Sequence, residues 1–381
     1  MRLWPFRPRP RYVISAMPPE DLLALEDLLR RNVEDILVVR ERQLRGLSVV
    51  FGGELLVSPA RALELLEGRF KPFGYTPFLR EEGGKVWVQG LPLAEVTETG
   101  RPWVNALLFL ATCVSTVWAG ATVWAGAETL NPFADWARLR EGTLFAGTLL
   151  SILVTHEFGH YFTARYHKAS VSLPYFIPAP PPLMGTLGAI IKMRSPARDR
   201  SSLFDIAVAG PLAGLAVAIP ALMLGLFWSH TIRIGPETHG PAVGPSLLIY
   251  YLIHWSFGPV PPNTAVELHP LALGGWLGLL VTALNLFPVG QLDGGRIAYA
   301  LFGAHHRKVS MATFFALLAL GVVTRSPNWF VWAALLFFLV GFHHSPPLND
   351  VTPLSLGRRV LGVACLLLLV LLIPPIPIAI R

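Results

Sequence analysis

Charged residues and cysteines are scarce in this chain. Asp, Glu, Lys and Arg together make up 14% of its 381 residues, whereas 53% are hydrophobic, and the mean hydropathy is +0.52. So apolar a chain cannot be a wholly soluble globular protein, and much of it must lie in a membrane. The only cysteines, Cys113 and Cys365, lie in different apolar segments, which argues against a disulfide or a cysteine zinc site.

The chain also lacks a stripe of basic and aromatic residues of the kind that contacts nucleic acid. Its formal net charge is +7, but Lys and Arg are spread along the sequence. An excess of basic residues in the inner loops of a multi-pass membrane protein explains this charge better, and no nucleic-acid partner is expected. No short apolar core with a cleavage site follows the first arginines, so no signal peptide is expected.

Residues 1–102 have a soluble character and predict a small α/β domain. Leucines at helical spacing predict a helix over 18–31, and Ser58-Pro59 predicts the start of another, because proline favours the first helical position. Extended segments are expected within 36–57 and near 76–80 and 85–88, the last two joined by a glycine turn. Nothing in this domain suggests catalysis.

Residues 103–381 predict an all-α membrane-embedded domain, with a catalytic core at 142–300 and a short membrane-associated β element. The stretch 246–257 is apolar but too short to span comfortably, so a re-entrant or interfacial element is expected there. About seven transmembrane helices are expected, near 103–126, 142–165, 204–228, 271–290, 309–323, 328–343 and 359–380.

Basic residues also predict how the chain is oriented. They are concentrated in the loops after the second and fourth segments and before the seventh, while the alternate loops carry few. By the positive-inside rule, the N-terminal domain faces the cytoplasm and the C-terminus lies outside, in an inner or plasma membrane. The basic residues concerned are Lys168, Lys192, Arg194, Arg198, Arg200, Arg296, Arg307, Lys308, Arg358 and Arg359.

The most informative motif is His156-Glu157-Phe158-Gly159-His160, within the apolar stretch 144–162. Two histidines at i and i+4 lie on one face of a helix about one turn apart, so both imidazoles can reach one zinc ion. Glu157 lies beside the metal as a general base. The alternative is a pair of structural histidines satisfied by carbonyls, which is costly at membrane depth, where ionisable side chains usually mark a functional site.

A catalytic zinc needs a third protein ligand in addition to an open position for water. The run NLFPVGQLDGG at 285–295 supplies Asp293, which falls at the end of the fourth segment, on the same inner side as the histidines. Topology therefore brings Asp293 to the depth of His156 and His160. The alternative is an ordinary turn residue in an Asp-Gly pair. The expected cofactor is Zn2+.

These runs resemble the signature elements of the site-2 protease family of intramembrane zinc metalloproteases, peptidase family M50. The run FDIAVAGPLAG at 204–214 is also similar to the family's central core helix, and its Gly210, Pro211 and Gly214 are expected to let helices approach closely or to permit a kink beside the site. The matching residues of the two signature elements are His156, Glu157, His160, Asn285, Pro288, Asp293 and Gly294.

Within the family, the chain looks closest to the branch without a PDZ domain. That branch includes the chloroplast proteins named for ethylene-dependent gravitropism deficiency and yellow-green leaves. Its Gly-Asn-Leu-Arg-Gly motif is similar to the run from Arg42 to Gly46, in which Arg and Gln replace the first two residues.

The resemblance implies hydrolysis of a peptide bond in or near a transmembrane segment of a single-pass membrane protein. It also implies that Asn285 donates a hydrogen bond to the substrate backbone or oxyanion. Zinc-activated water would be the nucleophile and Glu157 the general base. The oligomeric state is left open.

The run 184–193 has the glycines and apolar alternation of a bent strand or hairpin that dips into the membrane interface. An unpaired edge there could bind the unwound substrate as a further strand, with Gly185, Gly188, Ile190 and Ile191 as the binding residues. The alternative is a plain loop that packs on the membrane. The proline-rich stretch 174–182 is expected to be a semi-rigid linker into this element.

Two other functions compete with proteolysis. A membrane metal transporter would have several ionisable groups spread along a path, whereas here they cluster at one depth. A catalytically silent scaffold that binds membrane proteins is the other alternative, and the intact Glu157 argues against it.

Overall fold

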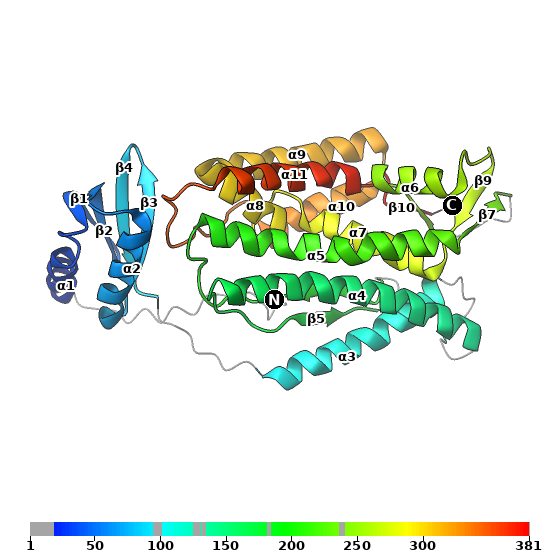
Figure 1. Cartoon of the computed structure of the whole chain (residues 1–381), viewed down its shortest axis with the longest axis horizontal. Coiled ribbons are helices and arrows are strands. Elements are labelled where there is room, and N and C mark those ends of the chain that lie inside the picture. Colours follow the sequence, from blue (N-terminus) through cyan, green and yellow to red (C-terminus); the bar gives the residue numbers. More distant parts are fainter. Residues whose placement is uncertain are drawn as a thin grey trace, which may run out of the picture. The chain divides into compact units, whose positions relative to one another are not determined.

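The computed structural model describes residues 19–93, 101–124, 131, 135–180, 184–235 and 241–380. Contacts divide the chain into two compact units. The first comprises residues 1–99 together with 194–200 and 345–353, and the second comprises 100–193, 201–344 and 354–381. Figure 1 shows the elements of each unit by label and colour.

The first unit is a four-stranded antiparallel sheet with two helices, α1 (Pro19–Arg31) and α2 (Pro59–Phe70). The strand order is β1-β2-β4-β3, and the short 3-10 helix η1 (Lys71–Phe73) follows α2. The small N-terminal α/β domain expected from the sequence is therefore present. Its strands are β1 (Leu37–Arg45), β2 (Ser48–Leu55), β3 (Thr76–Glu82) and β4 (Lys85–Leu91).

Two later segments extend this sheet beyond its edge strand β3. The Leu79 amide donates to the Leu348 carbonyl (2.7 Å) and the Asp350 amide donates to the Leu79 carbonyl (2.9 Å). The Leu348 amide in turn donates to the Ala197 carbonyl (2.9 Å), and the Leu348 side chain is buried in the core of the unit. An edge strand presents unpaired backbone groups, and these segments satisfy them.

The second unit is mostly helical, and its core lies among α4 (Trp136–Tyr166), α5 (Arg200–Phe227) and α7 (Pro270–Asn285). Figure 1 shows α4 and α5 running side by side. The remaining helices are α3 (Pro102–Ala119), η2 (Gly120–Trp124), α6 (Leu247–Phe257), α8 (Asp293–Phe302), η4 (Gly303–His305), α9 (His306–Thr324), α10 (Pro327–Leu335), η5 (Leu336–Val340) and α11 (Leu356–Leu372).

Short two-stranded sheets complete this unit. The hairpin of β5 (Tyr175–Pro178) and β6 (Thr186–Ile190) is antiparallel, with Phe176 opposite Ala189. The stretch expected to be only a linker therefore contains a strand, because the backbone of 175–178 finds a partner across the hairpin. The other pairs are β7 (His230–Arg233) with β9 (Thr264–Glu267), and β8 (Pro241–Val243) with β10 (Ile378–Ile380).

The expected count of seven transmembrane helices is not confirmed. Among the described residues, three helical stretches are long and apolar enough to cross a membrane: Pro102–Val123, Arg200–Phe227 and Asp293–Thr324. The predicted span 271–290 ends as a helix at Asn285. Its 16 residues cover only about 24 Å at 1.5 Å per residue, and so fall short of a full span.

Candidate metal centre

The two histidines of the HExxH motif lie in the interior of α4. Their ring centroids are 4.9 Å apart, as the i, i+4 spacing predicts. Only 3% of His156 and 7% of His160 are exposed, and Glu157 between them is 7% exposed. A stretch of buried apolar residues, including Phe145, Leu149 and Leu153, precedes the motif on the same helix. The motif is therefore built into a packed helix, away from bulk water.

Asp293 reaches the histidines because the chain turns sharply between α7 and α8. Gly290 adopts a positive φ of 51° in this turn, and α8 begins at Asp293 itself. Gly294 and Gly295 let α8 lie directly against the turn: a Cβ on Gly294 would come within 1.9 Å of the Leu286 carbonyl oxygen. The two glycines after Asp293 are therefore required for steric reasons. The turn places Asp293, which is 8% exposed, beside the two histidines.

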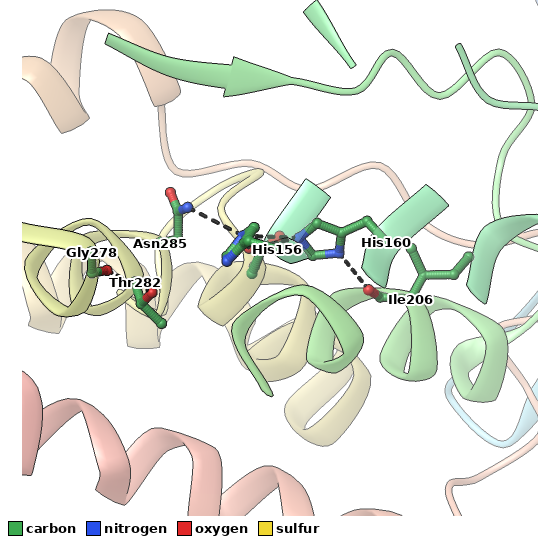
Figure 2. Close-up of polar contacts among 7 residues, drawn as sticks. His156, His160, Ile206, Gly278, Thr282 and Asn285 are labelled. Carbon is green, nitrogen blue, oxygen red and sulfur yellow. Dashed lines mark hydrogen bonds and ion pairs between the residues drawn. The ribbon is translucent and has the colours of Figure 1, made fainter. Parts of the chain in front are cut away.

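The three predicted ligands converge. The Asp293 Oδ2 atom lies 3.2 Å from His156 Nε2 and 3.1 Å from His160 Nε2, and the two Nε2 atoms are 3.2 Å apart. Together the three side chains form a group whose ligand atoms could hold one metal ion. Figure 2 shows both imidazoles with their polar partners.

The hydrogen bond on the far side of His160 fixes which ring nitrogen faces this group. His160 Nδ1 lies 2.6 Å from the Ile206 carbonyl oxygen (Figure 2), an acceptor, so Nδ1 carries the proton and donates it. In the neutral ring Nε2 then carries a lone pair, which is directed at the carboxylate of Asp293. Two electron-rich atoms 3.1 Å apart repel each other unless a proton or a metal ion lies between them. A backbone carbonyl that orients a histidine in this way is typical of metal sites.

The separations also fit the size of a zinc shell. For ligands about 2.0–2.1 Å from zinc in tetrahedral geometry, neighbouring donor atoms are about 3.3 Å apart. The three separations in the structure, 3.1, 3.2 and 3.2 Å, lie close to this value. Two imidazoles and one carboxylate are a common donor set for a catalytic zinc, which leaves one position open. The residues present therefore fit the ion that the sequence predicts.

Helix α5 packs against the two histidines through glycines. A Cβ on Gly210 would lie 2.1 Å from His160 Nε2, and one on Gly214 would lie 3.3 Å from His156 Nδ1. On α4, a Cβ on Gly159 would lie 2.7 Å from the Ala209 carbonyl oxygen. The close helix approach expected at Gly210 and Gly214 is thus present, and each glycine adjoins a predicted ligand. Gly159 and the Ile206 carbonyl are parts of the site that the sequence analysis missed.

A polar network around Asp205 connects the first part of α5, which contains Ile206, to α4 and α11. Asp205 accepts two hydrogen bonds from Arg358 of α11, both 2.8 Å, and lies 3.0 Å from His167 Nε2 at the end of α4. Three helices thus meet at the residue next to the carbonyl that orients His160. This network of hydrogen bonds joins α5 to α4 and α11 beside Ile206.

The other predicted residues lie at different distances from this group. The Asn285 amide nitrogen, on the last residue of α7, is 3.4 Å from His156 Nε2 (Figure 2), a long contact that places the amide beside the ligands. Gly185, Gly188 and Ile190 lie on the β5–β6 hairpin, outside the ligand group, and Ile191 follows the last residue of β6. Within the hairpin, 65% of Leu187 and 57% of Ile190 are exposed.

The chain is similar to known zinc metalloproteases. The family model of peptidase family M50 matches residues 144–324, which include all three predicted ligands. The probable zinc metalloprotease EGY2, chloroplastic, of Oryza sativa subsp. indica is 30% identical over 342 residues, which are 86% of this chain and 62% of that protein. EGY1 of Arabidopsis thaliana, also a probable chloroplastic zinc metalloprotease, is 34% identical over 256 residues, which are 65% of this chain and 44% of that protein. No solved structure matches the chain.

Proposed function

The chain belongs to peptidase family M50, the site-2 protease family, and we propose that it is a zinc-dependent membrane protease. We propose further that it hydrolyses a peptide bond in or near a transmembrane segment of a single-pass membrane protein. The chain spans 62% of the length of the EGY2 protein quoted above. The observation that carries these proposals is the convergence of His156, His160 and Asp293.

Zinc is the cofactor that the donor set fits, held by His156, His160 and Asp293. When bound, it supplies Lewis-acid activation of a water molecule and of the scissile carbonyl. The surrounding backbone orients one of these ligands: the Ile206 carbonyl fixes the His160 ring, and Gly210 leaves the space that this ring occupies beside α5.

Glu157 is the general base in this proposal. It follows a ligand on the same helix and is almost completely buried, so its carboxylate has little competing water. It takes the proton of the attacking water as the new C–O bond forms, and passes that proton to the leaving nitrogen as the C–N bond breaks. Atoms and protons balance without any further reactant.

Asn285 and the edge of β6 would contact the substrate. The Asn285 amide lies beside His156 and carries N–H donors that can bind the substrate carbonyl. Substrate must be extended at the cut, because a helix keeps its carbonyls in i→i−4 hydrogen bonds. Within the described residues β6 pairs only with β5, so its second edge can accept an extended peptide as a third strand.

The membrane location follows from the apolar helices, while the orientation remains part of the proposal. We retain the prediction that the N-terminal unit faces the cytoplasm and the C-terminus lies outside, in an inner or plasma membrane, because basic residues flank the spans on that side. The relatives quoted are named as chloroplastic, which assigns a compartment to them and not to this chain.

Of the competing functions, transport is less favoured by the site. Among the described residues one group of metal ligands is found, whereas a transport path would need ionisable groups at several depths. Hydrolysis requires one metal site with a general base beside it, and Glu157 can serve as that base.

Cleavage of a transmembrane test peptide by the purified chain tests the proposal. We expect Glu157→Gln to retain zinc and to lose cleavage by about 10²-fold or more, the size of a general-base contribution. Glu141→Gln is the matched control, since Glu141 lies on the same helix, outside the ligand group. Cleavage that survives in the Glu157 variant would refute the assignment, and loss in both variants would point to a general effect on folding.

A further inference from the structure

The first helix of the second unit, α3, is hydrogen-bonded to both ends of the β5–β6 hairpin. Near the start of α3, the Asn105 amide donates to the carbonyls of Leu173 (3.1 Å) and Pro174 (2.9 Å), just before β5. Near its end, the Ser115 hydroxyl lies 2.6 Å from the Gly185 carbonyl oxygen, just before β6. Ser115 lies ten residues after Asn105, which is about 15 Å along the helix, the length of a short strand.

These contacts are specific. Asn105 is a polar residue only 9% exposed on a mostly apolar helix. An amide in such a place needs partners, and the two carbonyls before β5 supply them. The Ser115 hydroxyl has one proton and three acceptors in reach, at 2.6 Å (Gly185), 3.0 Å (Ala111) and 3.2 Å (Thr112). The shortest contact is to the hairpin, so the proton is donated there.

Steric contacts support the same arrangement. Gly185 has a φ of 76°, and a Cβ there would come within 2.4 Å of the Ser115 carbonyl oxygen and of Thr116 Cα. The hairpin backbone therefore touches the α3 backbone at this point, which only glycine permits. Between the two hydrogen-bonded ends, the rings of Phe109 and Phe176 pack edge to face with centroids 5.0 Å apart. The hairpin is thus fixed along α3 at three levels.

The arrangement leaves one edge of the hairpin available. β5 packs on α3, and β6 contacts α4, the helix that carries His156 and His160. Leu187 and Ile190 of β6 expose more than half of their side chains. The α3 contacts fix the position of β6 along the helix axes, so they also fix the position of a peptide that pairs with β6.

We propose that Asn105 and Ser115 are positioning residues that determine which peptide bond of an added substrate strand comes to the metal centre. This inference rests on the proposed function, in which β6 accepts substrate as a strand. In a β-ladder the side chains alternate, so a strand that slips while keeping its buried face must slip by two residues. Release of the Gly185 carbonyl from Ser115 lets β6 move along α3 and changes that register.

The test uses the full chain with Ser115→Ala, and with Ser151→Ala as the matched control. Ser151 lies on α4 and donates only to the Gly147 carbonyl of its own helix (2.6 Å), on an exposed face. For Ser115→Ala we expect some cuts of the test peptide to move by two residues. We also expect KM to rise about fivefold, as the loss of one hydrogen bond implies, with kcat and zinc content changed less than about twofold. Ser151→Ala should match wild type in all four.

A second measurement does not depend on catalysis. In the Glu157→Gln background, photo-reactive residues are placed singly at Ile190 of β6 and at Asn285 beside the ligands, and mass spectrometry locates the peptide position that each one links. We expect the position linked from Asn285 to shift by two residues when Ser115→Ala is added. The position linked from Ile190 should stay the same, because the peptide moves together with β6. Both cross-links should be lost in Gly185→Ala, whose Cβ has no room against α3.

The outcomes separate this inference from the proposed function. Cross-linking with the expected shift but no cleavage by wild type would uphold the inference and refute the protease. Cleavage by wild type with the cut positions and the Asn285 cross-link position unchanged in Ser115→Ala would refute the inference and leave the protease standing. Absence of any cross-link at Ile190 would also refute it, because β6 would then not be the docking edge.

Discussion

Alanine at Gly210 should disrupt the metal centre, because the added methyl group would collide with the ring of a predicted ligand. The new Cβ would lie 2.1 Å from His160 Nε2, 2.4 Å from Cε1 and 2.5 Å from Cδ2. Ordinary carbon contacts in proteins are about 3.5–4.0 Å, so the ring and α5 must separate by more than about 1 Å. Metal sites tolerate errors of about 0.2 Å in ligand position. His160 would therefore be lost as a ligand.

The expected result is a fall in zinc affinity of at least about 100-fold, the upper range for changes that only reorient a ligand. Zinc binding to Gly210→Ala and wild type would be titrated in metal-buffered detergent solution. Gly147→Ala is the control, because Gly147 lies on α4 with open space around its Cβ position. There alanine should be neutral or stabilising by up to about 1 kcal/mol through helix propensity. Equal zinc affinity in Gly210→Ala and Gly147→Ala would refute the reasoning.

Two further predictions concern residues away from the ligands. Ser310 of α9 is fully buried, donates to the Pro288 carbonyl (3.1 Å) and accepts from the Gly290 amide (3.5 Å). Ser310→Ala should make the turn between α7 and α8 about 1–3 kcal/mol less stable. It should also weaken zinc binding about tenfold, measured by the same titration. Unchanged zinc affinity would show that this turn does not control the position of Asp293. Leu348→Ala should destabilise the first unit by about 2–4 kcal/mol, seen as faster proteolysis within residues 19–93, with zinc content unchanged. Equal proteolysis rates would contradict the claim that the buried Leu348 side chain stabilises this unit.

The sequence predicted which candidate ligands come together better than it predicted their surroundings. The HExxH spacing and the shared depth of Asp293 predicted three side chains that the fold does bring together, and the family prediction from the same runs is confirmed. These features are encoded locally, in helical periodicity and in the charge of loops. The Ile206 carbonyl is different, since every residue has a carbonyl and no residue type signals its use.

Non-local pairing was also beyond the sequence. The stretch 174–182 has the composition of a linker, yet 175–178 is a strand because residues 186–190 lie beside it. Residues 348–350 carry no strand pattern and still extend the sheet at Leu79. The count of membrane spans failed for a related reason: apolar runs such as 271–290 continue past the point where the helix ends, at the turn that delivers Asp293.

X-ray absorption at the zinc edge of the purified chain, with the metal content measured on the same sample, tests the central claim most directly. The account predicts one zinc per chain, with nitrogen and oxygen ligands at about 2.0–2.2 Å, two imidazoles among them, and no sulfur. It also predicts that Asp293→Ala removes the stoichiometric zinc. A chain without stoichiometric zinc, or a zinc bound through Cys113 or Cys365, would contradict it.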